Sequence, residues 1–177
     1  MRVWDIHPGF LNRQSLLGEH REIHAIHTIL TLGKKGYSRH PETLRWRDHL
    51  GALWLRHEQV VVEMRVRGFN HFSPLLPPSG TEIIWPSVFI DAPSRQFELL
   101  AEKYAQKEQG RFPLPIPTGV DELLASHAHA LTSSERRIFK THSDTPDTFA
   151  AIASALVQLL RQSAAQKARA VLGASPF

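Results

Sequence analysis

The part of the sequence that most constrains the fold is residues 13–32, which have the periodicity of an amphipathic α-helix. Asn12 is suited to cap the start of this helix, and Gly33 is suited to end it. The apolar positions that recur on one side are Leu16, Ile23, Ile26 and Leu30. The stretch therefore predicts a long helix that packs one face against a core.

Further helices are predicted along the rest of the chain. Pro41 suits the first position of a second helix that runs to about Arg67, with Gly68 as its stop. A third helix is expected over about 93–109. The segment 73–93 is rich in proline and is predicted to be irregular, although its stretch EIIWPSVFI could pair briefly as a strand.

The C-terminal part is also predicted to be helical, which makes the expected fold class all-α. We expect short helices near 120–131 and 133–141, and a long last helix to about Leu172, with Thr145 as cap and Pro146 in its first position. The predicted organisation is a helical core over 1–112, a proline-rich connector over 113–119, and C-terminal helices over 120–177 that pack on the core as one unit.

Composition excludes several classes of protein. The chain has no cysteine, so disulfide scaffolds, thiolate metal sites and a cysteine nucleophile are excluded. No apolar run is long enough to cross a bilayer, and Asp5 and His7 stand where a signal peptide needs an apolar core. We expect a cytoplasmic protein without a membrane partner. A monomer is expected, with a dimer through the C-terminal helices as the alternative.

The excess of positive charge lies in the first 70 residues, which hold 11 Lys or Arg against 7 Asp or Glu; the remainder holds 10 of each. Within this region, residues 33–47 interleave basic side chains with Tyr37 and Trp46. Taken alone, the window favours a solvated loop and helix start. The alternative is a surface for a phosphate backbone whose bases stack on aromatic rings. The basic side chains are Lys34, Lys35, Arg39, Arg45 and Arg47.

Three histidines, His20, His24 and His27, follow one face of the first predicted helix in the stretch EHREIHAIH. This is not the H-E-x-x-H pattern of zinc peptidases, because Glu22 lies about 200° around the helix from His20. No clear carboxylate ligand accompanies the histidines, and Arg21 would repel a dication. We therefore favour partly buried histidines or a polar face, and expect no metal and no cofactor, over a metal-dependent hydrolase or nuclease.

The sequence begins Met1-Arg2, and methionine aminopeptidases remove methionine only before a small residue. A retained Met1 would present a free α-amine. The pKa of an α-amine is about 8 and that of a lysine about 10.4. At neutral pH a much larger fraction of the α-amine is therefore unprotonated and able to act as a nucleophile. Such an amine can form an imine with a sugar anomeric carbon, assisted by a nearby carboxylate.

Several stretches in the same order give the chain a family resemblance. They are Arg2, RQSLLGEHREI at 13–23, MRVRGFN at 64–70 and LLAEKYAQ at 99–106. Together they resemble the pyrimidine-dimer DNA glycosylase (endonuclease V) family. The resemblance implies a compact all-α domain of the endonuclease V type, here with additional C-terminal helices. It also implies DNA glycosylase activity with abasic-site lyase activity, through a Schiff base on the N-terminal α-amine.

The resemblance also implies roles for individual residues. The α-amine of Met1 matches the nucleophile and Glu22 the catalytic glutamate, while Arg2, Gln14, Arg21 and Lys103 match DNA-contacting positions. His20 and His24 would add polar contacts. Independently of the resemblance, the basic segment 33–47 is expected to add phosphate contacts through Lys34, Lys35, Arg39 and Arg45. Ser15, Ala25 and Leu99 differ from the residues at the matching positions of the phage enzyme of this family. The aromatic C-terminal tail of that enzyme is also missing here, and the proline-rich connector and the C-terminal helices take its place.

The predicted function is therefore a DNA repair glycosylase and abasic-site lyase that needs no metal. Its expected partner is damaged double-stranded DNA, from which a nucleotide is flipped out of the stack. Two alternatives stay open at this point. One is the metal-dependent nuclease or hydrolase that would use the histidine helix, and the other is a DNA-binding module without catalysis.

Overall fold

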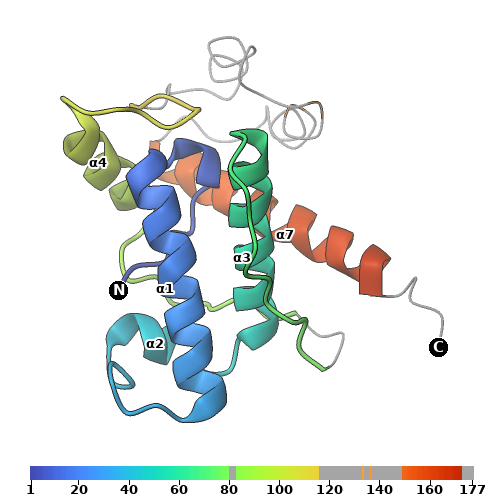
Figure 1. Ribbon diagram of the computed structural model, residues 1–177. Helices are drawn as coiled ribbons and strands as arrows, with labels where there is room; N and C mark the ends of the chain where they lie inside the picture. Colours follow the sequence, from blue (N-terminus) through green and yellow to red (C-terminus); the bar gives the residue numbers. More distant parts are fainter. Residues whose placement is uncertain (80–82, 116–132, 134–135, 137–148, 173–177) are drawn as a thin grey trace. The chain divides into compact units, whose positions relative to one another are not determined.

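The computed structural model describes residues 1–79, 83–115, 133, 136 and 149–172. Every regular element with bounds in these ranges is helical, which confirms the all-α prediction (Figure 1). The elements are the 3₁₀ helix η1 (Pro8–Phe10) and the α-helices α1 (Arg13–Leu32), α2 (Pro41–Arg45), α3 (Leu50–Val66), α4 (Pro93–Tyr104) and α7 (Phe149–Leu172). None of the described helices is long and apolar enough to cross a membrane.

The chain divides into two compact units that are interleaved along the sequence. The first unit consists of Met1–Trp4, Gln14–Ile90 and Ala164–Phe177. The second consists of Asp5–Arg13 and Asp91–Ser163. The division at 112 and 119 that the sequence suggested stays a prediction.

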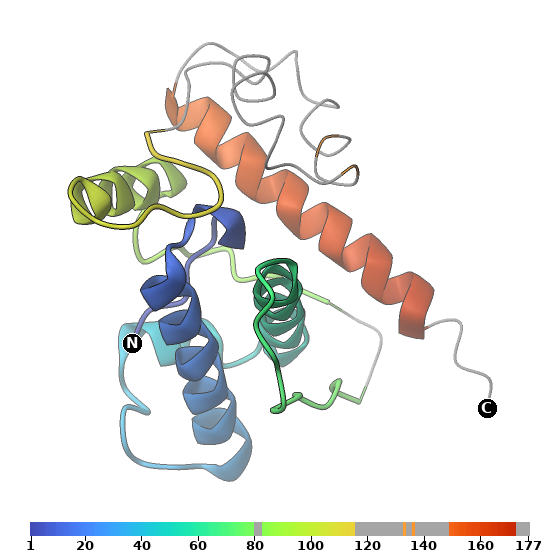
Figure 2. The same cartoon turned by 45° about the horizontal axis from the view of Figure 1, so that its top comes forward.

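In the first unit, α1 and α3 lie side by side, as Figures 1 and 2 show from two directions. The apolar positions predicted for α1 are largely correct, because Leu16, Ile23 and Ile26 are fully buried. On α3 the buried apolar side chains include Leu53, Val60, Val61 and Met64. Leu55 forms a further cluster with Ala164 and Ala168 of α7, against which Trp54, Ile83 and Trp85 pack.

The prediction of one continuous helix over 41–67 was wrong, because the structure has two helices there, α2 and α3. Trp46 ends α2 with a ψ angle near 0°, and its indole is 1% exposed and donates to Glu42 Oε1 at 3.0 Å. The backbone then turns so that His49 N donates to Trp46 O at 3.0 Å. Burial of this aromatic ring and its hydrogen bond therefore override the local helical periodicity.

Both glycine stops are confirmed. Gly33 follows α1 with φ 61°, and Gly68 follows α3 with φ 76°. In this left-handed region a side chain would strain the backbone, so glycine is favoured at the end of a helix.

In the second unit, the third helix ends at Tyr104 and not at about 109 as predicted. Tyr104 is fully buried, and its hydroxyl accepts a hydrogen bond from Asn12 N at 3.2 Å. Gln109 Nε2 donates to the Tyr104 carbonyl at 2.8 Å. This side chain satisfies a carbonyl that the end of the helix leaves without an intrahelical partner.

Phe10, Phe97 and Phe112 form the aromatic centre of the second unit, with Phe10 edge-on to the other two rings at 5.0 and 5.1 Å. The carboxylate of Asp5 accepts hydrogen bonds from Gln96 at 3.0 Å and from Arg161 at 2.7 Å. These contacts hold η1 and its flanks against α4 and the first part of α7.

Two other predictions concern the remaining segments. Residues 83–90 form no strand, so the expected pairing of EIIWPSVFI is not seen in its described part. The predicted end of the last helix at about Leu172 is confirmed. The helices expected near 120–131 and 133–141, and the cap at Thr145 and Pro146, lie outside the described residues or almost entirely so.

Candidate active site

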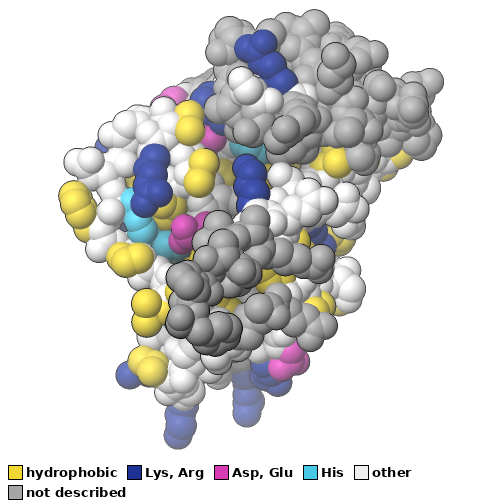
Figure 3. Space-filling model, turned by 90° about the vertical axis from the view of Figure 1, so that its right-hand side faces the viewer, with side chains coloured by type: hydrophobic (Ala, Val, Ile, Leu, Met, Phe, Trp, Pro, Cys, Tyr) yellow, Lys and Arg dark blue, Asp and Glu magenta, His cyan; other side chains and the backbone are white. Residues whose placement is uncertain are grey.

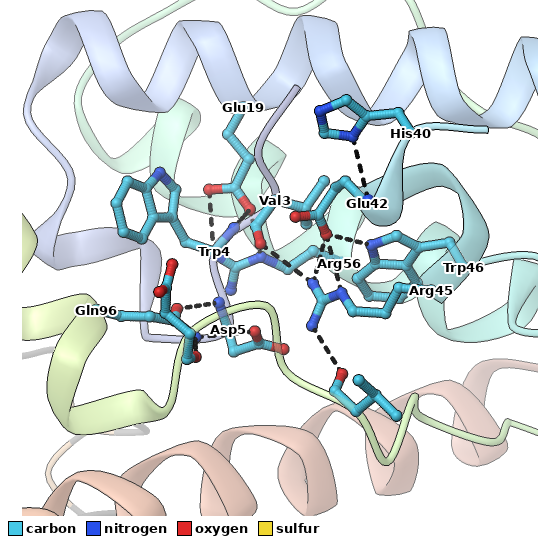
Figure 4. A network of polar contacts seen from close by, with 12 residues as sticks. Val3, Trp4, Asp5, Glu19, His40, Glu42, Arg45, Trp46, Arg56 and Gln96 are labelled. Atoms are coloured by element: carbon cyan, nitrogen blue, oxygen red, sulfur yellow. Dashed lines mark hydrogen bonds and ion pairs between the residues drawn. The ribbon is translucent and has the colours of Figure 1, made fainter. Parts of the chain in front are cut away.

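The N-terminal segment of the first unit is held between α1 and α2 (Figure 4). Trp4 N donates to Glu19 Oε1 on α1 at 3.2 Å, and Val3 O accepts from Arg45 Nη2 on α2 at 3.2 Å. Met1 Sδ accepts from the Thr43 hydroxyl at 3.8 Å. The first residues are therefore anchored by backbone and side chain, which fixes the region in which the α-amine lies.

Glu19 is itself fixed by a buried ion pair with Arg56 of α3. Arg56 Nε lies 2.7 Å from Glu19 Oε1, and Arg56 Nη2 lies 3.2 Å from Glu19 Oε2. The two side chains are 1% and 0% exposed. This two-pronged pair is geometrically specific and joins α1, α3 and the N-terminal segment through a single carboxylate.

Arg45 takes part in a similar buried network. Its guanidinium lies 2.7 Å from Glu42 Oε1, and both side chains are 1% exposed. Glu42 Oε1 also accepts from the Trp46 indole (Figure 4). Arg45 thus holds the N-terminal segment rather than presenting its charge to solvent, and we leave it out of the proposed phosphate contacts.

Glu22, the expected catalytic glutamate, lies half-buried on α1. It is one turn farther along α1 than Glu19, and residues three apart lie on neighbouring parts of a helix surface. Trp4 contacts Glu19, whereas Met1 lies farther toward α2, at Thr43. The N-terminus lies beside α1 on the side of α2 in Figures 1 and 2. Along α1, Glu22 is therefore displaced from Glu19 in the same direction in which Met1 is displaced from Trp4.

The polar residues expected to contact DNA differ in their exposure. Gln14, Arg21, Lys34, Lys35 and Arg39 are exposed in the first unit, and Lys103 is exposed on α4 in the second. Arg2 is half-buried, with its guanidinium 4.3 Å from the centre of the Trp4 ring. His20 is only 9% exposed, which leaves it little surface for a ligand contact.

The basic loop between α1 and α2 forms an open pocket of about 670 Å³. Its lining residues are Lys35, Tyr37, Ser38, Arg39 and His40. Tyr37 is 70% exposed, so its ring is available for stacking, whereas Trp46 is buried in the core. Of the two aromatic side chains in this basic segment, only Tyr37 is therefore exposed beside the cations.

The face of α1 opposite Glu22 carries a cluster of histidines. His20 and His24 meet His57 of α3 and His71 of the following segment, and one nitrogen from each lies within 4.8 Å of the others. His27, which the sequence grouped with the first two, is not a member of this set. His57 and His71 were missed because no local pattern connects them to α1; only the packing of α3 brings them there.

The cluster disfavours positive charge. Burial, and then the neighbouring histidines His24, His57 and His71, lower the pKa of His20 to about 4. Burial is also the largest cause that lowers the pKa values of His24 and His71. The imidazole of His20 is therefore neutral at physiological pH, with a lone pair available on the ring.

This shift predicts that the metal-free protein loses stability in acid. Between pH 6.5 and about 4 the unfolded state binds a proton at His20 that the folded state does not, so stability falls as the pH falls through this range. Most of the loss of stability that His20 causes should be reached near pH 4. Urea unfolding in the presence of a chelator, at pH 7 and pH 4.5, measures it. The His20→Gln variant should show a shallower pH dependence; equal dependence in the two proteins would contradict this assignment.

Comparison with known proteins agrees with the resemblance seen in the sequence. Residues 1–76 match the family model described as pyrimidine dimer DNA glycosylase. No curated protein and no solved structure matches the chain. The matched range includes Met1, Glu22 and the anchored N-terminal segment, and it includes all four clustered histidines. Through residues 1–76, this chain is similar to the pyrimidine dimer DNA glycosylase family.

Proposed function

We propose that this protein is a DNA repair glycosylase that also cleaves abasic sites by β-elimination, with the α-amine of Met1 as nucleophile and Glu22 as the catalytic carboxylate. The observation that carries the proposal is the anchoring of the N-terminal segment along α1, inside the range matched by the family. An amine held in place avoids much of the entropic cost of bringing the nucleophile to the sugar.

The chemistry assigns one role to each group. The uncharged amine attacks C1′ of the damaged nucleotide, the glycosidic bond breaks, and the base leaves with the bonding electrons and a proton. The resulting imine makes the C2′ proton acidic, and Glu22 removes it as the 3′ phosphate departs. Water then hydrolyses the imine and releases the amine. The carboxylate also stabilises the iminium cation while it exists.

The proposed DNA contacts are the exposed cations and amide of the first unit, together with the half-buried Arg2 and with Lys103 of the second unit. Arg21 precedes Glu22 on α1, so a phosphate bound there would bring the sugar near the carboxylate. The loop with Lys35, Tyr37 and Arg39 supplies further charge and a stacking surface. Damaged double-stranded DNA is the proposed partner, with the target nucleotide flipped toward Met1.

Borohydride trapping on a duplex with a single abasic site tests the proposed nucleophile. We expect a covalent adduct that peptide mass analysis places on the α-amine of Met1, because borohydride reduces the imine to a stable amine. A matched variant with two residues added before Met1 displaces the α-amine and should lose the adduct and the cleavage. Adducts only on lysines, or an adduct that the extension leaves unchanged, would overturn the assignment.

The same experiment separates the two rival functions. A non-catalytic DNA-binding module would bind the duplex but give neither adduct nor cleavage. A metal-dependent nuclease would cleave without an adduct, and its cleavage would stop in a chelator and return with added Zn²⁺ or Mn²⁺.

A further inference from the structure

The proposed catalysis by an amine and a carboxylate does not use the four-histidine cluster. Its members come from three separate segments of the first unit: His20 and His24 from α1, His57 from α3, and His71 from the residues after α3. His57 is fully buried and His20 nearly so. His24 and His71 are partly exposed. Figure 3 shows, without distinguishing individual residues, that histidine side chains reach the surface on one face of the molecule.

Several ring nitrogens lack the partners that buried imidazoles normally have. Nε2 of His24 and Nε2 of His57 are buried without a hydrogen-bond partner. Nε2 of His20 and Nε2 of His71 face each other at 3.1 Å. A buried polar atom without a partner costs free energy, so a ligand that accepts lone pairs from several imidazoles at once would stabilise this arrangement.

The ring positions match those around a tetrahedral metal ion. With metal–nitrogen distances of about 2.0–2.1 Å, the centres of four imidazole rings should lie roughly 5.2 Å apart and their ligand nitrogens about 3.4 Å apart. The measured centroid distances are 4.7 Å for His20–His24, 5.0 Å for His20–His57 and His20–His71, 4.9 Å for His24–His57 and 5.2 Å for His57–His71. The nitrogens, within 4.8 Å of one another, need only small side-chain adjustments.

Three of the four histidines, His24, His57 and His71, also hydrogen-bond to the surrounding protein. His57 Nδ1 lies 2.9 Å from Glu58 Oε1, and this hydrogen bond is the largest cause of the lowered pKa of Glu58. The backbone of Ser73 hydrogen-bonds both His24 and His71. A carboxylate or carbonyl that accepts the other N–H of a histidine orients the ring and raises its basicity as a ligand.

We propose that His20, His24, His57 and His71 bind one late first-row transition-metal dication, with Zn²⁺ as the principal candidate. A set of four neutral imidazoles suits Zn²⁺, Co²⁺, Ni²⁺ or Cu²⁺ rather than Mg²⁺ or Ca²⁺, which take oxygen ligands. The charged groups that act on the cluster are Arg21 and Arg65, which oppose a cation, and Glu58, which favours one.

The site is structural rather than catalytic, because four protein ligands leave no open position for water or substrate. The bound ion would join α1, α3 and the segment at His71. His20 and His24 lie on the face of α1 opposite Glu22. The metal would therefore stabilise the helix on that face without contacting the reacting atoms. This role does not depend on the proposed glycosylase chemistry.

Zinc binding to the full chain tests the site directly. Protein freed of metal by a chelator and dialysed is titrated with Zn²⁺ in competition with a chromophoric chelator, and its thermal unfolding is followed with and without the ion. We expect one Zn²⁺ per chain and a rise in the melting temperature. In protein loaded with Co²⁺, we expect the visible absorption of a tetrahedral site.

Variants separate a metal site from four packed histidines. His71→Gln removes a partly exposed ligand outside the helices, so the protein should keep its far-ultraviolet circular dichroism while its zinc affinity falls more than tenfold. Glu58→Gln should weaken binding by about 10–100-fold through the orientation of His57. His27→Gln, on α1 but outside the cluster, is the control and should bind normally. Absence of zinc binding in the parent, or equal binding in His71→Gln, would overturn the proposal.

Discussion

The Glu22→Gln variant is expected to lose about 10²–10⁴-fold in the rate of strand cleavage at an abasic site while its affinity for the same DNA changes little. The amide keeps the size and hydrogen-bonding capacity of the side chain but can neither take up a proton nor balance the charge of an iminium cation. Single-turnover cleavage of a labelled duplex measures the rate, and fluorescence anisotropy measures the binding.

A matched acid variant controls for the loss of one negative charge. Glu98 is an exposed acid on α4, paired with Arg95 at 3.0 Å, and Glu98→Gln should cleave at the parental rate. Borohydride trapping of Glu22→Gln adds a further readout, because a slower elimination step should leave the imine in place for longer. Cleavage by Glu22→Gln at the parental rate would exclude Glu22 as the catalytic carboxylate.

The Arg56→Met variant is expected to lower the free energy of unfolding by about 3–5 kcal/mol. Methionine fills much of the volume of arginine, but it leaves the carboxylate of Glu19 buried without its principal cation. Because Glu19 also accepts from Trp4 N, the N-terminal segment should loosen, and cleavage should fall as well. Urea unfolding at neutral pH gives the stability, and the trapping yield reports on the position of the α-amine.

Two further variants test whether this loss of stability comes from the buried Glu19–Arg56 pair. In Arg95→Met the lost ion pairs with Glu98 and Glu102 are at the surface, and stability should be nearly unchanged. The double variant Glu19→Gln with Arg56→Met removes both charges of this buried pair, so part of the lost stability should return. A parental unfolding curve for Arg56→Met would show that the pair contributes nothing to the fold.

Some features of the candidate site follow from resemblance and others from packing alone. Glu22 and Met1 could be proposed from the sequence because their pattern is local and lies in the matched range 1–76. The structural role of Arg45 could not be predicted from the sequence. Its position in a basic segment suggests exposure to solvent, whereas contacts with Glu42 and Val3 O hold it in the interior.

By itself, the sequence determined the helical class, the bounds of α1 and the stops at Gly33 and Gly68, because apolar periodicity and backbone freedom act within a few residues. Tertiary structure decided the break at Trp46, where burial of the indole outweighs helix propensity. It also decided the histidine cluster, since His57 and His71 reach α1 only when α3 packs against it. Contacts between residues distant in sequence depend on how the helices pack, and no local pattern encodes that packing.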